Sequence, residues 1–165
     1  MLGDMRRHAS DPSRLVEAAF HRIHIEHMHD VPIANSALQV QALDFALWQH
    51  NWLGVLITPW FINLLLLPGT DGQWESVSGN KRLFRSFPSG NYAFLGGKED
   101  EIGEYQSCSL ISAMSEFAAQ EDACAVAREV IKHMIKAPEP ELNTTVAPKE
   151  PSPSKRRFLL FGYRR

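Results

Sequence analysis

The sequence predicts an α+β fold: a mainly antiparallel sheet of about five or six strands, with an N-terminal and a C-terminal helix packed on it. The first observation behind this is the apolar segment 52–68, which is interrupted at Thr58-Pro59 and at Asn63. A bilayer span takes about 20 continuous apolar residues, so two buried strands that meet at the proline explain the segment better. The second observation is that segments 10–27 and 116–136 repeat apolar residues with helical spacing.

The first helix is expected to begin near Ser10-Asp11-Pro12, which offers an N-cap residue and a proline suited to the first turn. It is expected to end near His27. Its apolar face consists of residues three and four positions apart: Leu15, Val16, Ala19, Phe20 and Ile23. Several histidines gather at its far end: His21, His24, His27 and His29. Solvent-facing and capping roles explain them better than a metal site, because no cysteine or EXXH pattern joins them.

Three strands forming a meander are expected next. Segment 40–48 alternates apolar and polar residues, Gln49-His50-Asn51 is a turn signal, and 52–57 returns as the hairpin partner. Because proline donates no backbone hydrogen bond, Thr58-Pro59 is placed at a bend between 52–57 and the buried strand 61–67. Residues 73–80 then form a polar loop that carries Trp74.

A second hairpin is expected later in the chain. Segment 83–87 is a short strand or an approach to one, and 92–97 and 104–111 pair around an acidic turn. The second helix opens at Ser115 or Gln120 and runs to about Lys136. Its apolar stripe comprises Ala119, Ala123, Val126, Ala127, Val130, Ile131, Met134 and Ile135.

The domain organisation follows from these segments. Residues 1–9 are expected to be flexible, 10–136 form a single α+β domain, and the proline-rich 137–154 form a linker. The basic segment 155–165 contains an apolar run at 158–162. This run is expected to dock back on the domain as an edge strand, with a partner-binding motif as the alternative.

Composition narrows the class of protein. Apolar and charged fractions of 44% and 22% are typical of soluble globular chains, and a net charge of −2 gives no general case for binding nucleic acid or membrane. The two cysteines, Cys108 and Cys124, exclude a disulfide scaffold and fit a reducing compartment. Arg6-Arg7 is followed by no hydrophobic segment, so no export signal is expected and the chain is expected to be cytoplasmic.

Catalytic motifs are scarce, so no catalytic residue, metal ligand or cofactor is assigned. The sequence contains no P-loop, GxGxxG, GxSxG, HExxH or CxxC pattern. Cys108 lies in a predicted strand, where a buried cysteine usually acts as a small apolar residue. A dyad of Cys108 with His29 or His50 stays an alternative.

Two surface candidates for partner binding stand out. The first is the proline bend, where Trp60-Phe61 could expose an aromatic anchor for a peptide. The second is the acidic turn, because clustered carboxylates bind guanidinium groups in a bidentate manner, with a solvated turn that only aids solubility as the alternative. The predicted partner-binding residues are Thr58, Pro59, Trp60, Phe61, Glu99, Asp100, Glu101 and Glu104. Together they would suit a peptide in which arginines precede a hydrophobic run.

The order and spacing of several short motifs resemble the HybE/HupJ (HoxT) family of nickel-iron hydrogenase assembly chaperones. The motifs are Met28-His29-Asp30, Asp44-Phe45, Trp52, Gly54, Ile57-Thr58-Pro59-Trp60, Pro68-Gly69, Tyr105, Ser107-Cys108-Ser109-Leu110 and Leu159-Leu160-Phe161-Gly162. They cover almost the whole chain. The sequence departs from the family in its long 137–154 linker and in the cluster of His21, His24 and His27.

This resemblance implies a cytoplasmic accessory protein without enzymatic activity. Its expected partners are the hydrogenase small-subunit precursor with its twin-arginine leader, the large-subunit precursor, and a rubredoxin-like maturation protein. It would bind a precursor before export through the twin-arginine pathway. Two alternatives stay open: a redox or metallo-cofactor accessory protein that uses Cys108 and histidines, and a scaffold for other maturation factors.

Overall fold

The fold is an α+β arrangement of six strands and two main helices, as the sequence predicts. A computed structural model describes residues 5–77 and 81–136. In chain order the elements are α1 (Ser13–Ile23), the π-helical turn η1 (His24–Met28), β1 (Gln41–Trp48), β2 (Asn51–Thr58), β3 (Phe61–Leu67), β4 (Arg82–Phe87), β5 (Gly90–Glu99), β6 (Gly103–Ile111), the 3-10 turn η2 (Met114–Glu116) and α2 (Gln120–Ile135). No helix in these described ranges is long and apolar enough to cross a membrane.

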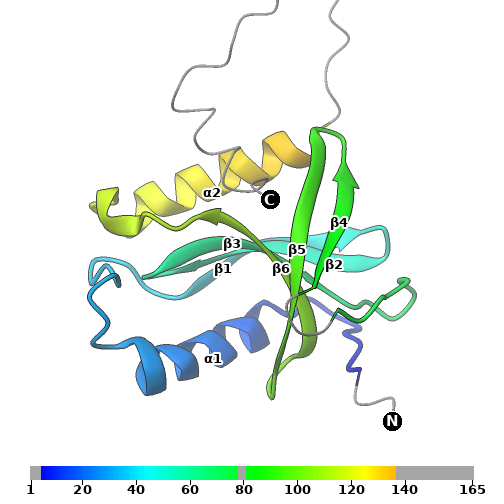
Figure 1. The fold of residues 1–165 in the computed structure, drawn as a ribbon, viewed down its shortest axis with the longest axis horizontal. Coiled ribbons are helices and arrows are strands. Elements are labelled where there is room, and N and C mark those ends of the chain that lie inside the picture. Colours follow the sequence, from blue (N-terminus) through cyan, green and yellow to red (C-terminus); the bar gives the residue numbers. More distant parts are fainter. Residues whose placement is uncertain (1–4, 78–80, 137–165) are drawn as a thin grey trace, which may run out of the picture.

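All six strands form one antiparallel sheet with the order β1-β2-β3-β6-β5-β4. The meander β1-β2-β3 and the later β4-β5-β6 therefore join through β3 and β6. α1 lies against one face of the sheet and α2 against the other (Figure 1). Two apolar clusters result, one under each helix. The apolar segment 52–68 supplies residues to both clusters, because successive side chains of a strand point to opposite faces.

A β-bulge in β1 changes which side chains of the strand face each side of the sheet. Asp44 has a positive φ of 56°, and the register with β2 shifts between Leu43 and Ala46. The extra residue places Leu43 in the cluster under α2 and Phe45 in the cluster under α1. The Phe45 ring lies directly over Gly54 of β2, where an added Cβ would lie 2.3 Å from the ring.

The turn between β1 and β2 consists of Gln49 and His50, with φ values of 52° and 69°. Two successive positive φ values are typical of the two-residue hairpin turns whose twist matches that of the strands. The turn is adjacent to Trp48, whose indole stacks on Phe87 of β4 with 4.4 Å between ring centroids. Because β1 and β4 are the two edges of the sheet, this contact shows that the sheet curls until its edges approach each other.

The N-terminal residues differ from the expected flexible segment. His8 is buried, its backbone N–H donates to Pro68 O at 2.8 Å, and an Nη1 of Arg7 donates to the carbonyls of Gly69 and Gly72. The indole of Trp52 also donates to His8 O at 2.9 Å. These bonds fix the chain just before α1, so the ordered domain begins earlier than residue 10.

The helix boundaries differ from the sequence expectation at several points. α1 begins at Ser13, where Asp11 rather than Ser10 accepts the backbone N–H of Ser13. It continues directly into η1, which ends at Met28, close to the expected end near His27, but its last residues are π-helical rather than α-helical. α2 begins at Gln120, the later of the two expected start points. The predicted linker 137–154 and segment 155–165 lie outside the described residues.

Candidate partner-binding site

The Thr58–Phe61 turn is a compact internal structure with two aromatic rings at its outer side. Thr58 is fully buried, and its Oγ1 accepts the backbone N–H groups of Trp60 at 3.2 Å and Phe61 at 3.0 Å. Pro59 is buried as well, and its carbonyl accepts the N–H of Asn35 at 2.8 Å. Trp60 and Phe61 are half-buried. Of the four predicted turn residues, therefore, two build the turn and two reach the surface.

The two turn aromatics pack around the C-terminal half of α1. The Phe20 ring lies 6.2 Å from that of Phe61 and 6.0 Å from that of Tyr105 on β6. The Trp60 indole lies 5.5 Å from the imidazole of His24, the first residue of the π-helical turn. Burial raises the pKa of Tyr105 to about 12, with a smaller contribution from Glu99. This aromatic group holds the turn, α1 and β6 together.

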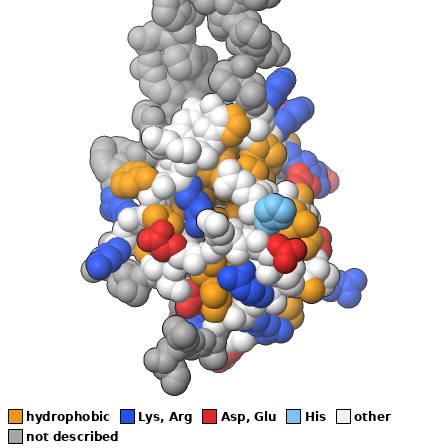
Figure 2. All heavy atoms as spheres, turned by 90° about the vertical axis from the view of Figure 1, so that its right-hand side faces the viewer, with side chains coloured by type: hydrophobic (Ala, Val, Ile, Leu, Met, Phe, Trp, Pro, Cys, Tyr) orange, Lys and Arg blue, Asp and Glu red, His pale blue; other side chains and the backbone are white. Residues whose placement is uncertain are grey.

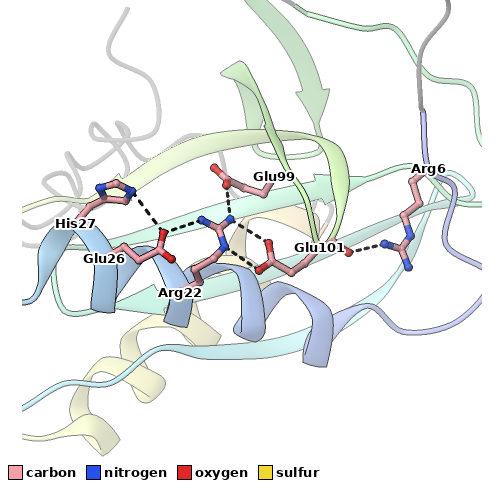
Figure 3. Close-up of polar contacts among 6 residues, drawn as sticks. All are labelled: Arg6, Arg22, Glu26, His27, Glu99 and Glu101. Carbon is pink, nitrogen blue, oxygen red and sulfur yellow. Dashed lines mark hydrogen bonds and ion pairs between the residues drawn. The ribbon is translucent and has the colours of Figure 1, made fainter.

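The acidic turn between β5 and β6 binds an arginine of the same chain (Figure 3). Arg22 of α1 donates from Nε to Glu101 Oε2 at 2.9 Å and from Nη2 to Glu101 Oε1 at 3.0 Å. Its Nη2 also reaches Glu99 Oε1 at 2.8 Å. A third carboxylate, Glu26 of η1, lies 3.4 Å from Nη1. Arg6 adds a bond to the backbone carbonyl of Glu101 rather than to its carboxylate.

These contacts give one guanidinium three carboxylate neighbours. The bonds to Glu101 and then to Glu99 raise the pKa of Arg22 above its ordinary value, and the same bond to Arg22 lowers the pKa of Glu101. Asp100, at the turn itself, is exposed and has no ion pair within the described residues. Arg6 and Lys98 lie beside Glu99 and Asp100 around a neighbouring hollow, so the acidic turn has further cations near it besides Arg22.

The fourth predicted acidic residue, Glu104, belongs to the other face of the sheet. Its Oε1 accepts the Trp74 indole N–H at 3.1 Å and the Ser76 hydroxyl at 2.7 Å. The alternation along β6 agrees: Cys108 lies in the cluster under α2, whereas Tyr105 packs against the cluster under α1. The structure thus gathers Trp60, Phe61, Glu99 and Glu101 around α1 and places Glu104 apart from them.

The cysteines lack the environment of a reactive thiol. Cys108 is 1% exposed, and burial raises its pKa to about 12, which disfavours the thiolate that metal binding and redox chemistry require. The pKa of Cys124 is also raised, and burial is the largest of its several causes. Within the described residues, no three His, Cys, Asp or Glu side chains are grouped so that they could hold a metal ion.

Sequence reasoning missed two arginines that make long-range contacts in the structure, Arg22 and Arg85. Arg22 lies on the polar side of an amphipathic helix, and nothing in the helical spacing indicates a partner on a distant hairpin. Arg85 of β4 is half-buried and donates from Nε to Gln106 Oε1 at 2.8 Å. The aromatic Trp74 beside a polar loop was a visible signal for that region, but its contact with Glu104 required the fold.

Comparisons with known proteins agree on one family. A family model described as NiFe-hydrogenase assembly, chaperone, HybE matches residues 11–162. Protein HoxT of Cupriavidus necator is 38% identical over 94% of this chain and 90% of its own length. Hydrogenase-2 operon protein HybE of Escherichia coli K12 is 30% identical, over 94% of this chain and 91% of its own.

A longer relative and a solved structure complete the comparison. "Probable rubredoxin HupJ" of Rhodobacter capsulatus is 37% identical over 73% of this chain, and the match spans 43% of that protein's length. The solution structure of HybE from Escherichia coli superposes with a TM-score of 0.68 at 26% identity, covering 92% of this chain and 93% of that one. The chain belongs to the HybE family of nickel-iron hydrogenase assembly chaperones.

Proposed function

We propose that this chaperone binds the precursor of a hydrogenase small subunit, including its twin-arginine leader, in the cytoplasm before export. It acts by binding and catalyses no reaction. The binding surface is the α1 side of the sheet, with Trp60 and Phe61 for apolar side chains and Glu99, Asp100 and Glu101 for arginines. Glu104 is left out of this surface because its carboxylate is on the opposite face.

One observation carries the proposal: the acidic turn already holds a guanidinium in the bidentate geometry that a leader arginine would adopt. Glu101 contacts Arg22 with both carboxylate oxygens, and Glu99 contacts the same guanidinium from β5. Bidentate pairs of this kind are shorter and stronger than single charged hydrogen bonds. The exposed Asp100, which has no ion pair within the described residues, is the carboxylate that remains for a second cation.

The apolar part of the surface lies on the same helix. Phe20, two residues before Arg22 on α1, contacts Phe61, and His24 of η1, two residues after Arg22, contacts Trp60. A leader in which arginines precede a hydrophobic run could therefore contact the carboxylates and the two rings together. Binding in this way lowers the concentration of free precursor, which delays export by mass action.

The comparisons support two further partners. The family is defined by hydrogenase assembly, so the large-subunit precursor is a second candidate ligand. The Rhodobacter capsulatus relative is described as a probable rubredoxin, and this chain matches less than half of its length. We therefore propose that a rubredoxin-like protein works beside this chaperone during maturation.

Binding of a fluorescein-labelled twin-arginine leader, followed by fluorescence anisotropy, tests the proposal. Reversing the exposed charge in Asp100→Lys is expected to weaken binding about three- to tenfold, since close like charges replace an attraction. Glu129→Lys is the matched control, because it makes the same charge change at an exposed site on α2. Trp60→Ala should weaken binding independently of salt.

A leader with both arginines replaced by lysine separates bidentate recognition from simple charge attraction. We expect it to bind more weakly than the native leader, because lysine cannot form the two parallel bonds. Equal affinities for the two leaders, together with equal effects of Asp100→Lys and Glu129→Lys, would remove the acidic turn from the site. A precursor without its leader that binds as well as the complete one would move recognition to the mature region.

A further inference from the structure

The strand β4 is an open edge of the sheet. It pairs only with β5, and the sheet order ends on it. Every second residue of an edge strand turns its N–H and C=O away from the sheet, where they can pair with another chain. Within the described residues, no backbone hydrogen bond from another segment reaches positions 82–87 on the outer side.

This edge carries more positive than negative charge, with Glu75 as the carboxylate near Arg85. Lys81, Arg82 and Arg85 lie along it, and none of them has an ion pair in the described part of the chain. Arg85 is the best placed of the three. Its Nε donates to Gln106 Oε1 at 2.8 Å, and Gln106, which is 1% exposed, is itself fixed by a bond to Glu75 O. The guanidinium is thus oriented by a buried amide rather than neutralised.

A hollow of about 420 Å³ adjoins the edge, between β4, the β1–β2 turn and the loop after β3. Figure 2 looks onto the side of the molecule where these segments lie in Figure 1, and hydrophobic and charged side chains are mixed there. The lining includes the rings of Trp48 and Trp74, the Arg85 side chain and Phe84. Phe84 is 62% exposed, so a large apolar ring is available to a partner at this edge.

We propose that the β4 edge and this hollow form a docking site for an extended segment of a partner protein that alternates carboxylate and apolar side chains. The segment adds to β4 as a further antiparallel or parallel strand. Because side chains of a strand alternate between its faces, apolar residues of the segment face the hollow, where Trp48, Trp74 and Arg85 lie, and its carboxylates face Arg82 on the other side of β4. One acidic residue, Glu75, also lines the hollow, and it leaves the three cations in excess.

The positive charge of the β4 edge favours an acidic segment over a basic one. An arginine-rich leader suits the acidic turn beside α1 but would be repelled by Lys81, Arg82 and Arg85. The two sites therefore bind different chemistry, and the β4 site goes beyond the proposed leader binding. The chaperone can bind a basic segment and an acidic one at separate places, so that failure of either proposal leaves the other testable.

The test uses the full chain and a labelled heptapeptide that alternates glutamate with valine and has a central phenylalanine. We expect saturable binding, with backbone amide shifts in two-dimensional NMR spectra at Arg82, Phe84 and Ser86 of β4. The same peptide with alternate amides N-methylated should bind about tenfold or more weakly, because it cannot form the ladder of backbone bonds. A peptide with glutamine in place of glutamate should lose a similar factor.

Protein variants complete the test. Arg85→Gln and Arg82→Gln, the latter at an exposed position, should each weaken binding, up to about tenfold, while Lys132→Gln removes the same charge from α2, outside the proposed site, and should have little effect. Arg85→Gln also removes the bond to Gln106, whereas Arg82→Gln removes a charge from β4 and leaves that bond in place. Equal binding of the N-methylated peptide, absence of binding, or shifts confined to α1 and the acidic turn would each overturn the proposal.

Discussion

The two edge strands of this sheet, β1 and β4, are built in opposite ways. The β1 edge is closed by side chains: Glu17 of α1 accepts the Ala42 N–H at 2.8 Å, and Gln120 of α2 exchanges bonds with the backbone of Gln39. The bulge at Asp44 further interrupts that edge. The β4 edge has no bulge and, within the described residues, no such side-chain caps.

The two edges therefore differ in whether their outer backbone groups can pair with another chain. Exposed edges invite pairing with other chains, and proteins commonly block them with bulges, charges or covering elements. Both helices contribute to blocking β1, whereas β4 has no covering element and only the charges of Arg82 and Arg85 to oppose pairing. A sheet with one blocked and one open edge offers an added strand one position, beside β4.

The largest expected effect comes from the same substitution made on each edge. Phe45→Ala on β1 should lower the free energy of unfolding by about 3–5 kcal/mol, because a buried ring over Gly54 is lost. Phe84→Ala on β4 should change it by no more than about 0.5 kcal/mol, because that ring is mostly exposed. Urea unfolding measures both. Similar losses would mean that the Phe84 ring is packed as tightly as the Phe45 ring, which would contradict an open β4 edge.

A smaller effect is expected when the cap of the β1 edge is removed. Glu17→Ala leaves the Ala42 N–H without its acceptor, which should cost about 1–2 kcal/mol and speed hydrogen exchange at that amide. Glu17→Gln is the control, because its carbonyl oxygen can still accept the bond. If exchange at Ala42 is as slow in the alanine variant as in the glutamine variant, the side chain does not protect this edge.

The smallest effect concerns Arg22, which joins the α1-covered part of the sheet to the β5–β6 turn. The bond to Arg22 lowers the folded-state pKa of Glu101 below its ordinary value of 4.5. The resulting stabilisation is therefore present above that value and is lost as pH falls through the lower, folded-state pKa. The stability difference between the native chain and Arg22→Gln should shrink over this acidic range in thermal unfolding scans. A difference that stays constant down to pH values well below 4.5 would show that Glu101 and Arg22 are not coupled.

The fold could be predicted where the chain signals its structure locally. The three-strand meander followed from alternation, an apolar run and Pro59, and its order is confirmed. The sequence around the bulge also contained a signal for it: the apolar residues shift from even-numbered positions, Val40 and Ala42, to odd-numbered positions, Phe45 and Leu47. It was not recognised, because such a change is also consistent with a strand that ends and restarts. The start of α1 was indicated by Ser10-Asp11-Pro12, and Asp11 accepts the backbone N–H of Ser13 there.

The candidate site could be predicted only in part. The sequence shows that Trp60 follows a bend and that acidic residues cluster, but whether Glu101 and Glu104 share a face depends on strand alternation across a turn of uncertain length. Arg22 and Arg85 gave no signal, because a charged residue on a helix or an edge strand is normally just solvated. Their importance comes from contacts with residues distant in sequence, such as Glu101 and Gln106.

The strand order has a consequence during synthesis on the ribosome. β3 is apolar along nearly its whole length and lies between β2 and β6 in the finished sheet. β6 is made only after β4 and β5, so β3 is a temporary edge while the chain emerges. Unpaired apolar edges in incomplete chains are prone to aggregation. A chaperone of hydrogenase assembly therefore passes through its own vulnerable stage, which ends only when β6 pairs with β3.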